Sequence, residues 1–265
     1  SDQPFEIHVI GTPSEESLDG GKNEMAAHGG FDHIDVAFMV HGSTLTQLET
    51  PSLALIEMDV EFHGKTAHAG IAPYAGRSAV DAVTMLQTGL GLMRNHLKDS
   101  SRVSNIVLAG GTAVNSVPDF AKVKVEIRHS SMAYLESVEQ WTREIAQAAA
   151  MATQTQVQIT PVAHIYNTTI NDAMGALLME CAEKFACDGI APPRKDCGST
   201  DFGAVTHRLP SCCLRVKTIE TDDPPHTDAW VKTGKEARAH QGIYDGAVCC
   251  ALAAFRLVKS EAKRS

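Results

Sequence analysis

The stretch KVKVEIR at residues 122–128 alternates charged and apolar side chains without a break. The stretches EMDVEF (57–62) and QVQIT (156–160) repeat this alternation. Successive side chains of a strand point to opposite faces, so such alternation indicates strands with one face in water, as in antiparallel sheets. The middle of the chain is therefore predicted to contain an antiparallel sheet.

Two helices are predicted among these strands. Apolar residues recur every three or four positions through residues 80–97 and again through residues 135–149. This spacing is typical of amphipathic helices. With a further strand near 104–109, the order becomes β-α-β-β-α-β, which predicts an α+β split-βαβ (ferredoxin-like) domain with both helices on one face of the sheet.

The flanking sequence has a different character. Short and nearly continuous apolar runs occur at PFEIHVI (4–10), DVAFMV (35–40) and PSCCLRV (210–216). Runs of this kind are typical of parallel strands buried on both faces. Helices are expected after the candidate N-caps Asn171 and Asp172, and at 236–258. We therefore predict an α/β chain with a mainly parallel sheet, built from residues 1–53 and 169–265 and interrupted by the α+β domain at 54–168.

Composition limits the classes of function. The 265 residues are 43% hydrophobic and 21% charged, as in globular domains. The net charge of −9 without a long basic stripe argues against a nucleic-acid partner. We expect no membrane helix and no signal peptide. Seven Cys without a CxxC motif indicate free thiols in the cytoplasm, and twelve His are a first indication of metal chemistry.

Acidic and imidazole side chains follow the three apolar runs. Glu15 and Glu16 follow the first run, His41 follows the second, and His226 lies in the loop after the third. Ligands of open parallel sheets bind beyond the carboxyl ends of the strands, so these residues are expected to converge. Carboxylate and imidazole suit zinc, and adjacent acids allow one to bind metal while the other moves protons. Taken singly, the Glu pair also fits a solvated loop and each His a structural role.

Seven segments in order carry a resemblance to a known family. They are GTPSEE (11–16), HIDVAFMVHG (33–42), GKTAHAG (64–70), GGTAVNSVPD (110–119), EIRH (126–129), GSTDFG (198–203) and PHTDAW (225–230). The chain resembles the zinc aminoacylase and carboxypeptidase G family of metallopeptidases (peptidase family M20). Within that family it looks most like the amidohydrolase branch with p-aminobenzoyl-glutamate hydrolase and the aminoacylase-like β-alanyl-lysine dipeptidase. The family fold is a zinc-binding α/β domain with an inserted α+β lid that mediates dimerisation.

The resemblance implies a role for each site residue. Glu15 would be the general base, and Glu16, His41 and His226 would bind zinc, with manganese or cobalt as alternatives. His68, on the lid, would reach the active site of the partner subunit of a homodimer and stabilise the oxyanion. Residues that would hold the substrate carboxylate or line the pocket are Asn115, Arg128, Gly198, Ser199 and Thr200. For Asp201, a partner of a zinc histidine and a plain loop cap are both open, and Arg128 and His68 also fit solvated surface positions.

One departure from the family pattern matters for activity. The family carries two further ligand motifs upstream of its Glu-Glu pair, and this sequence, which begins one strand before GTPSEE, contains neither. Three ligands are enough for one zinc ion with an open position. The expected reaction is hydrolysis of an amide bond in small N-acyl amino acids or dipeptides with a free carboxylate, although the chain alone could be inactive. The alternative is a non-catalytic dimerisation or interaction relative. In either case we expect a partner along an open sheet edge.

Overall fold

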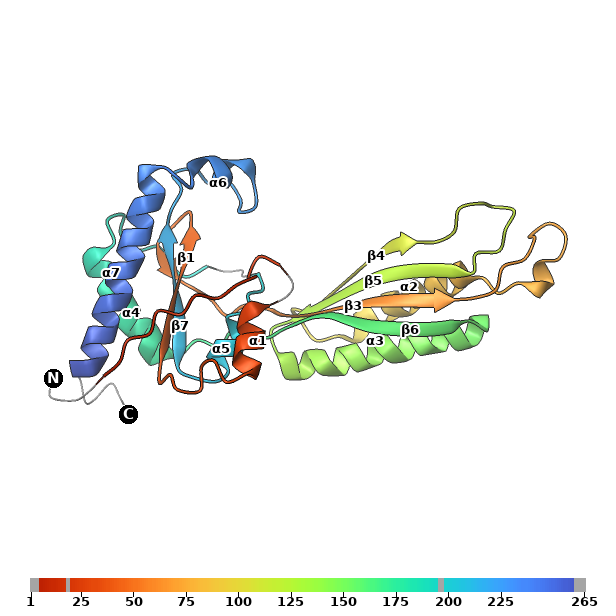
Figure 1. Cartoon of the computed structure of the whole chain (residues 1–265), viewed down its shortest axis with the longest axis horizontal. Coiled ribbons are helices and arrows are strands. Elements are labelled where there is room, and N and C mark those ends of the chain that lie inside the picture. Colours follow the sequence, from red (N-terminus) through yellow and green to blue (C-terminus); the bar gives the residue numbers. More distant parts are fainter. Residues whose placement is uncertain (1–4, 18–19, 195–197, 260–265) are drawn as a thin grey trace. The chain divides into compact units, whose positions relative to one another are not determined.

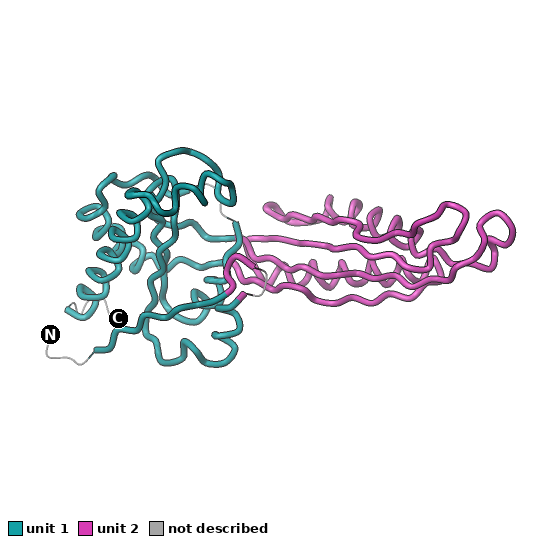
Figure 2. Tube along the Cα trace, turned by 45° about the horizontal axis from the view of Figure 1, so that its top comes forward, with its two compact units in different colours: residues 1–13, 21–52, 168–265 teal, residues 14–20, 53–167 magenta. Residues whose placement is uncertain are grey.

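The computed structural model of the chain describes residues 5–17, 20–194 and 198–259. They form two compact units (Figure 2). The flanking unit comprises residues 1–13, 21–52 and 168–265, and the inserted unit comprises residues 14–20 and 53–167. Each unit has its own sheet and its own hydrophobic core.

The inserted unit contains four antiparallel strands in the spatial order β4-β5-β3-β6 (Figure 1). Along the chain its main elements are β3 (Ala54–His63), α2 (Ala79–Met93), β4 (Arg102–Ala109), β5 (Phe120–His129), α3 (Met132–Thr153) and β6 (Gln156–Ile165). Short 3₁₀ turns, η1 (Pro73–Ala75) and η2 (Arg94–His96), precede and follow α2. The β-α-β-β-α-β order predicted from the periodicity is confirmed.

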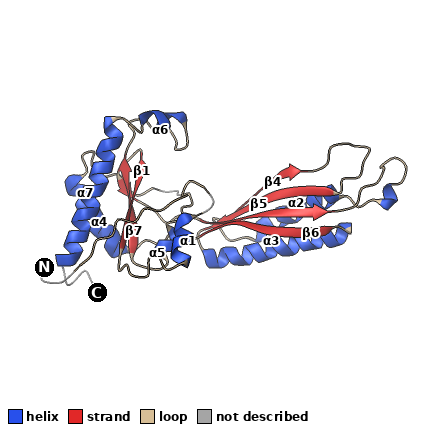
Figure 3. Cartoon of the chain, viewed as in Figure 1, coloured by secondary structure: helices blue, strands red, loops and turns tan. Residues whose placement is uncertain are grey.

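Alternation of apolar residues builds the core of the inserted unit. Val123, Val125 and Ile127 on β5 are fully buried, and α2 and α3 contact each other and cover this face (Figure 3). Both helices begin at serine caps: the side chain of Ser78 accepts from a backbone N–H of α2, and that of Ser131 does the same for α3. The other face of β5 carries Lys and Glu side chains, as the alternation requires.

The flanking unit has a three-stranded sheet in the order β1-β7-β2. The central strand β7 (Ser211–Lys217) is parallel to β1 (Ala37–Ser43) and antiparallel to the short β2 (Gln47–Leu48). Leu214 lies in the core cluster with α4 (Asp172–Phe185) and α7 (Ala237–Lys259). Cys213 lies in the cluster with α1 (Gly21–Ala27) and α5 (Gly203–Thr206), so the two sides of β7 contact different clusters. A further short helix is α6 (Asp228–Thr233).

The first predicted strand is wrong, but most of the strand pairing in the sheet is parallel as predicted, because only the two-residue β2 pairs antiparallel with β7. Pro4 lies outside the described residues, and residues 5–10 form no strand. Phe5, Ile7 and Val9 are 56%, 66% and 98% exposed. An apolar run becomes a buried strand only when another strand pairs with it, and no described strand does. The two-residue β2 gives no pattern that sequence reasoning could detect. Among the described residues, β1 pairs only with β7, so the expected partner along an open edge stays a prediction.

The last helix is the one described helix that is long and apolar enough to cross a membrane. Its Cys249, Ala253 and Leu257 are buried in the core of the flanking unit, as in the core helix of a globular domain. Its contact with the sheet is close: a Cβ placed on Gly246 would lie 2.5 Å from Val40 Cγ1. The predicted cap Asn171 is confirmed for α4, because its side chain accepts from Met174 N at 3.0 Å.

Candidate functional site

Two loops at one end of the inserted sheet bring His68 and Asn115 together. One loop follows β3 and the other precedes β5, and they pair through their backbones. Ala69 N donates to Asn115 O and Val117 N donates to Ala67 O, both at 2.9 Å. Both predicted site residues therefore lie side by side on exposed loops.

The tautomer of His68 is set within its own loop. Gly70 N donates to His68 Nδ1 at 3.2 Å, so Nδ1 is an acceptor and the neutral ring carries its proton on Nε2. An exposed Nε2–H can donate to an oxygen atom of a ligand. This is the property that an oxyanion-stabilising histidine needs.

Arg128 lies at the opposite end of the same sheet. In the ladder between β3 and β5, Phe120 stands opposite His63 and Arg128 stands opposite Leu55. Eight residues of strand separate Phe120 from Arg128, which is roughly 26 Å. The guanidinium of Arg128 donates to both carboxylate oxygens of Glu126, at 2.7 and 2.9 Å. One inserted unit therefore does not bring Arg128 to His68 and Asn115.

His41 lies on β1 in an arrangement that suits a metal ligand. Its Nδ1 is 2.6 Å from Gly42 O, and in the tautomer that donates to this carbonyl the lone pair of Nε2 is left for a metal ion. Histidines that bind metals commonly donate their other N–H in this way. Arg215 stands opposite His41 in the ladder with Nη1 3.1 Å from the same Nδ1, and it forms an ion pair with the buried Glu49.

The other predicted metal-site residues lie in loops. His226, between β7 and α6, has a left-handed backbone with φ of 64° and is exposed. Glu15 and Glu16 occupy a turn after Ser14, whose φ is 57°. Left-handed conformations are unfavourable for residues other than glycine and cluster at functional sites. Because the strand expected before Glu15 is not formed, the convergence of these acids with the two histidines stays a prediction.

Asp201 is engaged by a lysine. Its carboxylate accepts from Lys22 Nζ at 2.6 Å and from Lys22 N at 3.0 Å, and both side chains are buried. Asp201 thus holds the start of α1, which soon follows the Glu15–Glu16 turn, to the segment that carries Gly198, Ser199 and Thr200. Sequence reasoning did not single out Lys22, because a lysine near a glycine pair has no distinguishing pattern.

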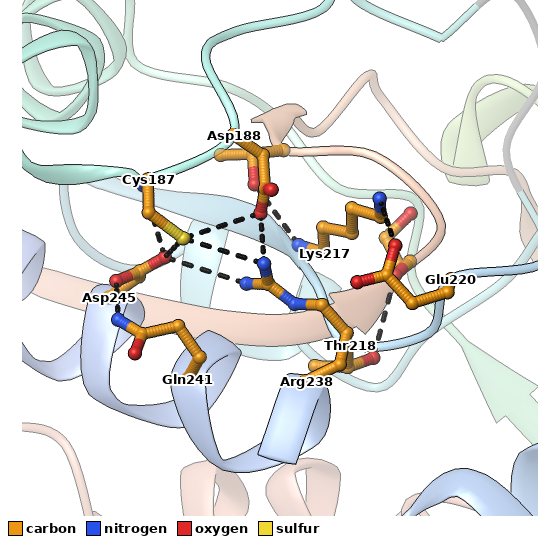
Figure 4. A network of polar contacts seen from close by, with 10 residues as sticks. Cys187, Asp188, Lys217, Thr218, Glu220, Arg238, Gln241 and Asp245 are labelled. Carbon is orange, nitrogen blue, oxygen red and sulfur yellow. Dashed lines mark hydrogen bonds and ion pairs between the residues drawn. The ribbon is translucent and has the colours of Figure 1, made fainter. Parts of the chain in front are cut away.

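A second polar cluster lies at the start of α7 (Figure 4). Cys187, Asp188 and Asp245 are the only group in the described part of the chain with three metal-ligand atoms close together. Cys187 Sγ donates to Asp245 Oδ2 at 3.3 Å, and the guanidinium of Arg238 forms ion pairs with both aspartates. The hydrogen bond from Arg238 lowers the pKa of Cys187, but desolvation and the two carboxylates raise it above its ordinary value. The cluster already contains its own cation, so it does not need a metal ion.

Comparisons with known proteins agree with these features. Residues 54–154 match the peptidase dimerisation domain of family M20. The chain is 31% identical over 233 residues to the Xaa-Arg dipeptidase of Mus musculus, covering 86% of this chain and 54% of the relative. It is 32% identical over 174 residues to one of the polypeptides of p-aminobenzoyl-glutamate hydrolase from Escherichia coli K12, covering 63% and 36%. The chain thus spans about half, or less, of the length of these curated relatives.

A solved structure supports the fold. The aminobenzoyl-glutamate utilization protein from Klebsiella pneumoniae superposes with a TM-score of 0.67 at 24% identity, covering 77% of this chain and 55% of that protein. The chain therefore carries a peptidase dimerisation domain, and its resemblance to the M20 family of aminoacylases, amidohydrolases and dipeptidases is confirmed over most of its length.

Proposed function

We propose that this chain takes part in metal-dependent hydrolysis of an amide bond in small N-acyl amino acids or dipeptides that carry a free carboxylate. The observation that carries the proposal is the pair of backbone-bonded loops that carry His68 and Asn115, together with the bond from Gly70 N to His68 Nδ1 that leaves the ring proton on Nε2. The names of two relatives, a dipeptidase and a p-aminobenzoyl-glutamate hydrolase, both describe amide cleavage. The reducing environment of the cytoplasm fits the six described cysteines, which are all free thiols.

The proposed metal ligands are Glu16, His41 and His226. Imidazole nitrogen and carboxylate oxygen are a donor set that zinc accepts, and the unused Nε2 of His41 fits this role. Manganese and cobalt remain compatible with the same donors. When bound, the metal would polarise the amide carbonyl and make a water molecule acidic at neutral pH.

The proton steps fall to Glu15. Its carboxylate takes a proton from the attacking water and delivers it to the nitrogen of the leaving amine. His68 donates its Nε2–H to the carbonyl oxygen as negative charge develops there. Arg128 and Asn115 hold the substrate carboxylate, since a guanidinium fork matches a carboxylate. To bind the substrate carboxylate, the guanidinium of Arg128 must release the carboxylate of Glu126. Gly198, Ser199 and Thr200 line the pocket.

This division of roles requires two copies of the chain. Arg128 and His68 lie at opposite ends of one sheet, so His68 and Asn115 of one copy must complete the site of another. The edge strand β4 is a suitable contact surface, because Ile106, Val107 and Leu108 are 59%, 45% and 50% exposed. An exposed apolar edge strand readily pairs with another chain. We therefore propose a homodimer through the inserted unit.

Variants of the full chain test the chemistry and the metal site separately. The protein is loaded with zinc, manganese or cobalt and assayed on N-acyl amino acids, β-alanyl dipeptides, Xaa-Arg dipeptides and p-aminobenzoyl-glutamate. Glu15→Gln should lower kcat about 10²- to 10⁴-fold without loss of metal. His226→Ala should lose the metal. Glu136→Gln, a change to an exposed acid on α3, is the matched control and should alter neither.

A mixing experiment tests the shared site. Glu15→Gln and His68→Ala should each be inactive alone, whereas co-refolded heterodimers should regain activity, because one of their two sites then has both groups intact. If the mixture stays inactive while the wild-type chain is active, the two-copy site is wrong. If the wild-type chain binds no metal and turns over no substrate, the alternative of a non-catalytic dimerisation module is favoured.

A further inference from the structure

A cavity in the inserted unit is lined by none of the proposed catalytic residues, although Arg102 in its lining stands opposite Arg128 in the ladder between β4 and β5. It has a volume of about 400 Å³ and is lined by Arg94 and residues 97–103, in the segment that connects α2 through η2 to β4. The lining contains three cations, Arg94, Lys98 and Arg102, and a single acid, Asp99. This local excess of positive charge is notable in a chain whose net charge is −9.

In the part of the chain that the structure describes, no carboxylate forms an ion pair with the three cations. Arg94 Nη2 donates to Val103 O at 2.8 Å and Arg102 Nη1 donates to Ser101 O at 2.9 Å. Within the described residues, neither arginine nor Lys98 forms an ion pair. Elsewhere on the same unit, Lys122 and Lys124 each bind two carboxylates. The positive charge of the cavity therefore exceeds that of its one acid, Asp99, and is available to a ligand.

Neutral contacts hold the segment in place around these charges. The bond from Arg94 to Val103 O joins its two ends. Lys98 N donates to Tyr134 Oη at 2.9 Å, while Lys98 Nζ lies 4.5 Å from the centre of the same ring. Ser100 has a left-handed φ of 66°, and its hydroxyl forms a hydrogen bond of 3.2 Å with the hydroxyl of Ser130. The backbone that presents the cations is thus fixed to α3 before any ligand arrives.

We propose that this cavity binds the phosphate group of a small ligand. Guanidinium groups donate paired hydrogen bonds to phosphate oxygens, and a lysine adds a compact positive charge. The hydroxyls of Ser100 and Ser101 also line the cavity. Its volume exceeds what one phosphate fills, so a phosphate monoester of a small organic molecule is the expected class. No proposed catalytic or metal-binding residue lines the cavity, so this ligand site goes beyond the amide hydrolysis proposed above, although Arg102 stands opposite Arg128 in the sheet.

Calorimetry on the full chain tests the site without an activity assay. Inorganic phosphate, glycerol 3-phosphate and citrate are titrated separately at constant ionic strength. Saturable binding is expected for the two phosphates, with glycerol 3-phosphate at least as tight as inorganic phosphate. Backbone amides of residues 94–103 should then exchange more slowly with deuterium. Absence of saturable phosphate binding, or tighter binding of citrate, would overturn the proposal.

Charge-matched variants separate a specific site from general attraction. Arg102→Gln and Lys98→Gln should each weaken phosphate binding about tenfold, as expected for one charged hydrogen bond. Arg143→Gln removes the same charge from the same unit, but Arg143 is paired with Glu139 on α3 outside the cavity. It should leave the affinity unchanged. Equal losses in all three variants would show non-specific attraction and reject the site. The cavity cations are exposed, so unfolding midpoints should stay close to that of the wild type.

Discussion

In the inserted unit, β5 buries every second side chain, whereas in the flanking unit β7 buries four in succession, from Ser211 to Leu214. One layer, α2 and α3, is enough to cover β5. The two sides of β7 need separate clusters, with α4 and α7 in one and α1 and α5 in the other, and these elements come from distant parts of the sequence. The inserted unit is thus assembled from nearly continuous sequence, and the flanking unit depends on contacts between separated segments.

The placement of charge follows the same difference. The ion pairs on the sheet of the inserted unit keep their cations partly exposed: Lys124 and Glu57 meet at 2.7 Å with side chains 31% and 8% exposed. The flanking unit buries the pair of Lys22 and Asp201, with side chains 8% and 1% exposed. Buried pairs are costly to break, because removing one partner leaves an uncompensated charge. The two units should therefore respond differently to single substitutions.

Lys22→Met should have the largest effect. We expect it to lower the free energy of unfolding of the flanking unit by about 3–5 kcal/mol, because Asp201 is left buried without its cation. Each unit has one tryptophan, Trp230 in the flanking unit and Trp141 in the inserted unit. Urea denaturation of Trp141→Phe and Trp230→Phe backgrounds therefore reports each unit separately, and only the signal of Trp230 should shift.

The double variant Lys22→Met with Asp201→Leu is the control for this pair. Replacing both charges by apolar groups should recover most of the lost stability. A loss below about 1 kcal/mol for Lys22→Met, the range of exposed pairs, would show that the pair is hydrated.

Leu86→Ala should act on the inserted unit. Leu86 on α2 is fully buried in the core between the helices and the sheet. The substitution should cost about 2–5 kcal/mol through lost burial and the remaining cavity. The fluorescence of Trp141 should report this loss while that of Trp230 does not change. A shift of both signals by the same amount would contradict the separation into two independent units.

The same contrast explains which parts of the fold the sequence predicts. Alternation in β3, β5 and β6 is a local signal, and these strands formed as expected. The run at residues 4–10 is also rich in apolar residues. Its burial would depend on a neighbouring strand, which no local pattern reveals. The two-residue β2 is formed by pairing with Arg215 and Leu214 of β7, a contact between distant segments.

The candidate site also contains features that the sequence could predict and features that it could not. The loop pair of His68 and Asn115 was within reach of motif comparison, because each residue lies in a recognisable segment. The bond between Lys22 and Asp201 joins residues 179 positions apart in the sequence. Lys22 lies in no recognisable motif, and the sequence left two roles open for Asp201. The occupation of Arg128 by Glu126 was also hidden, although the two residues share a strand face at positions i and i+2.

A rise in pH should destabilise the flanking unit more than the inserted unit, because all the cysteines lie in the flanking unit. Desolvation raises the pKa of Cys212 to about 12, that of Cys249 to about 11 and that of Cys250 to about 12, from a reference of 9.0. The folded state holds these protons more tightly than the unfolded state. The stability that they contribute is therefore complete below pH 9 and is lost as the pH rises toward 11–12.

At pH 10 the loss should reach about 1.4 kcal/mol for a thiol such as Cys212. The urea midpoint reported by Trp230 should fall between pH 8 and pH 10 more than that reported by Trp141. Lys122 and Lys124, with pKa values raised by their acidic partners, affect the inserted unit only at higher pH, above their reference of 10.5. Cys212→Ala should reduce the pH dependence of the urea midpoint of the flanking unit by the contribution of one thiol. Identical profiles for the two units would reject this assignment.

Arg143→Gln should have the smallest effect, although its hydrogen bonds to Glu139 are short, at 2.6 and 2.8 Å. The pair is formed one helical turn apart on α3, with side chains 26% and 20% exposed. Water solvates both charges after the bond is lost, so we expect a cost of about 0.3–0.5 kcal/mol that fades at high salt. The urea midpoint of Trp141 at low and high salt measures it. A salt-independent loss above 2 kcal/mol, comparable to that of Lys22→Met, would mean that the inserted unit also relies on desolvated charge.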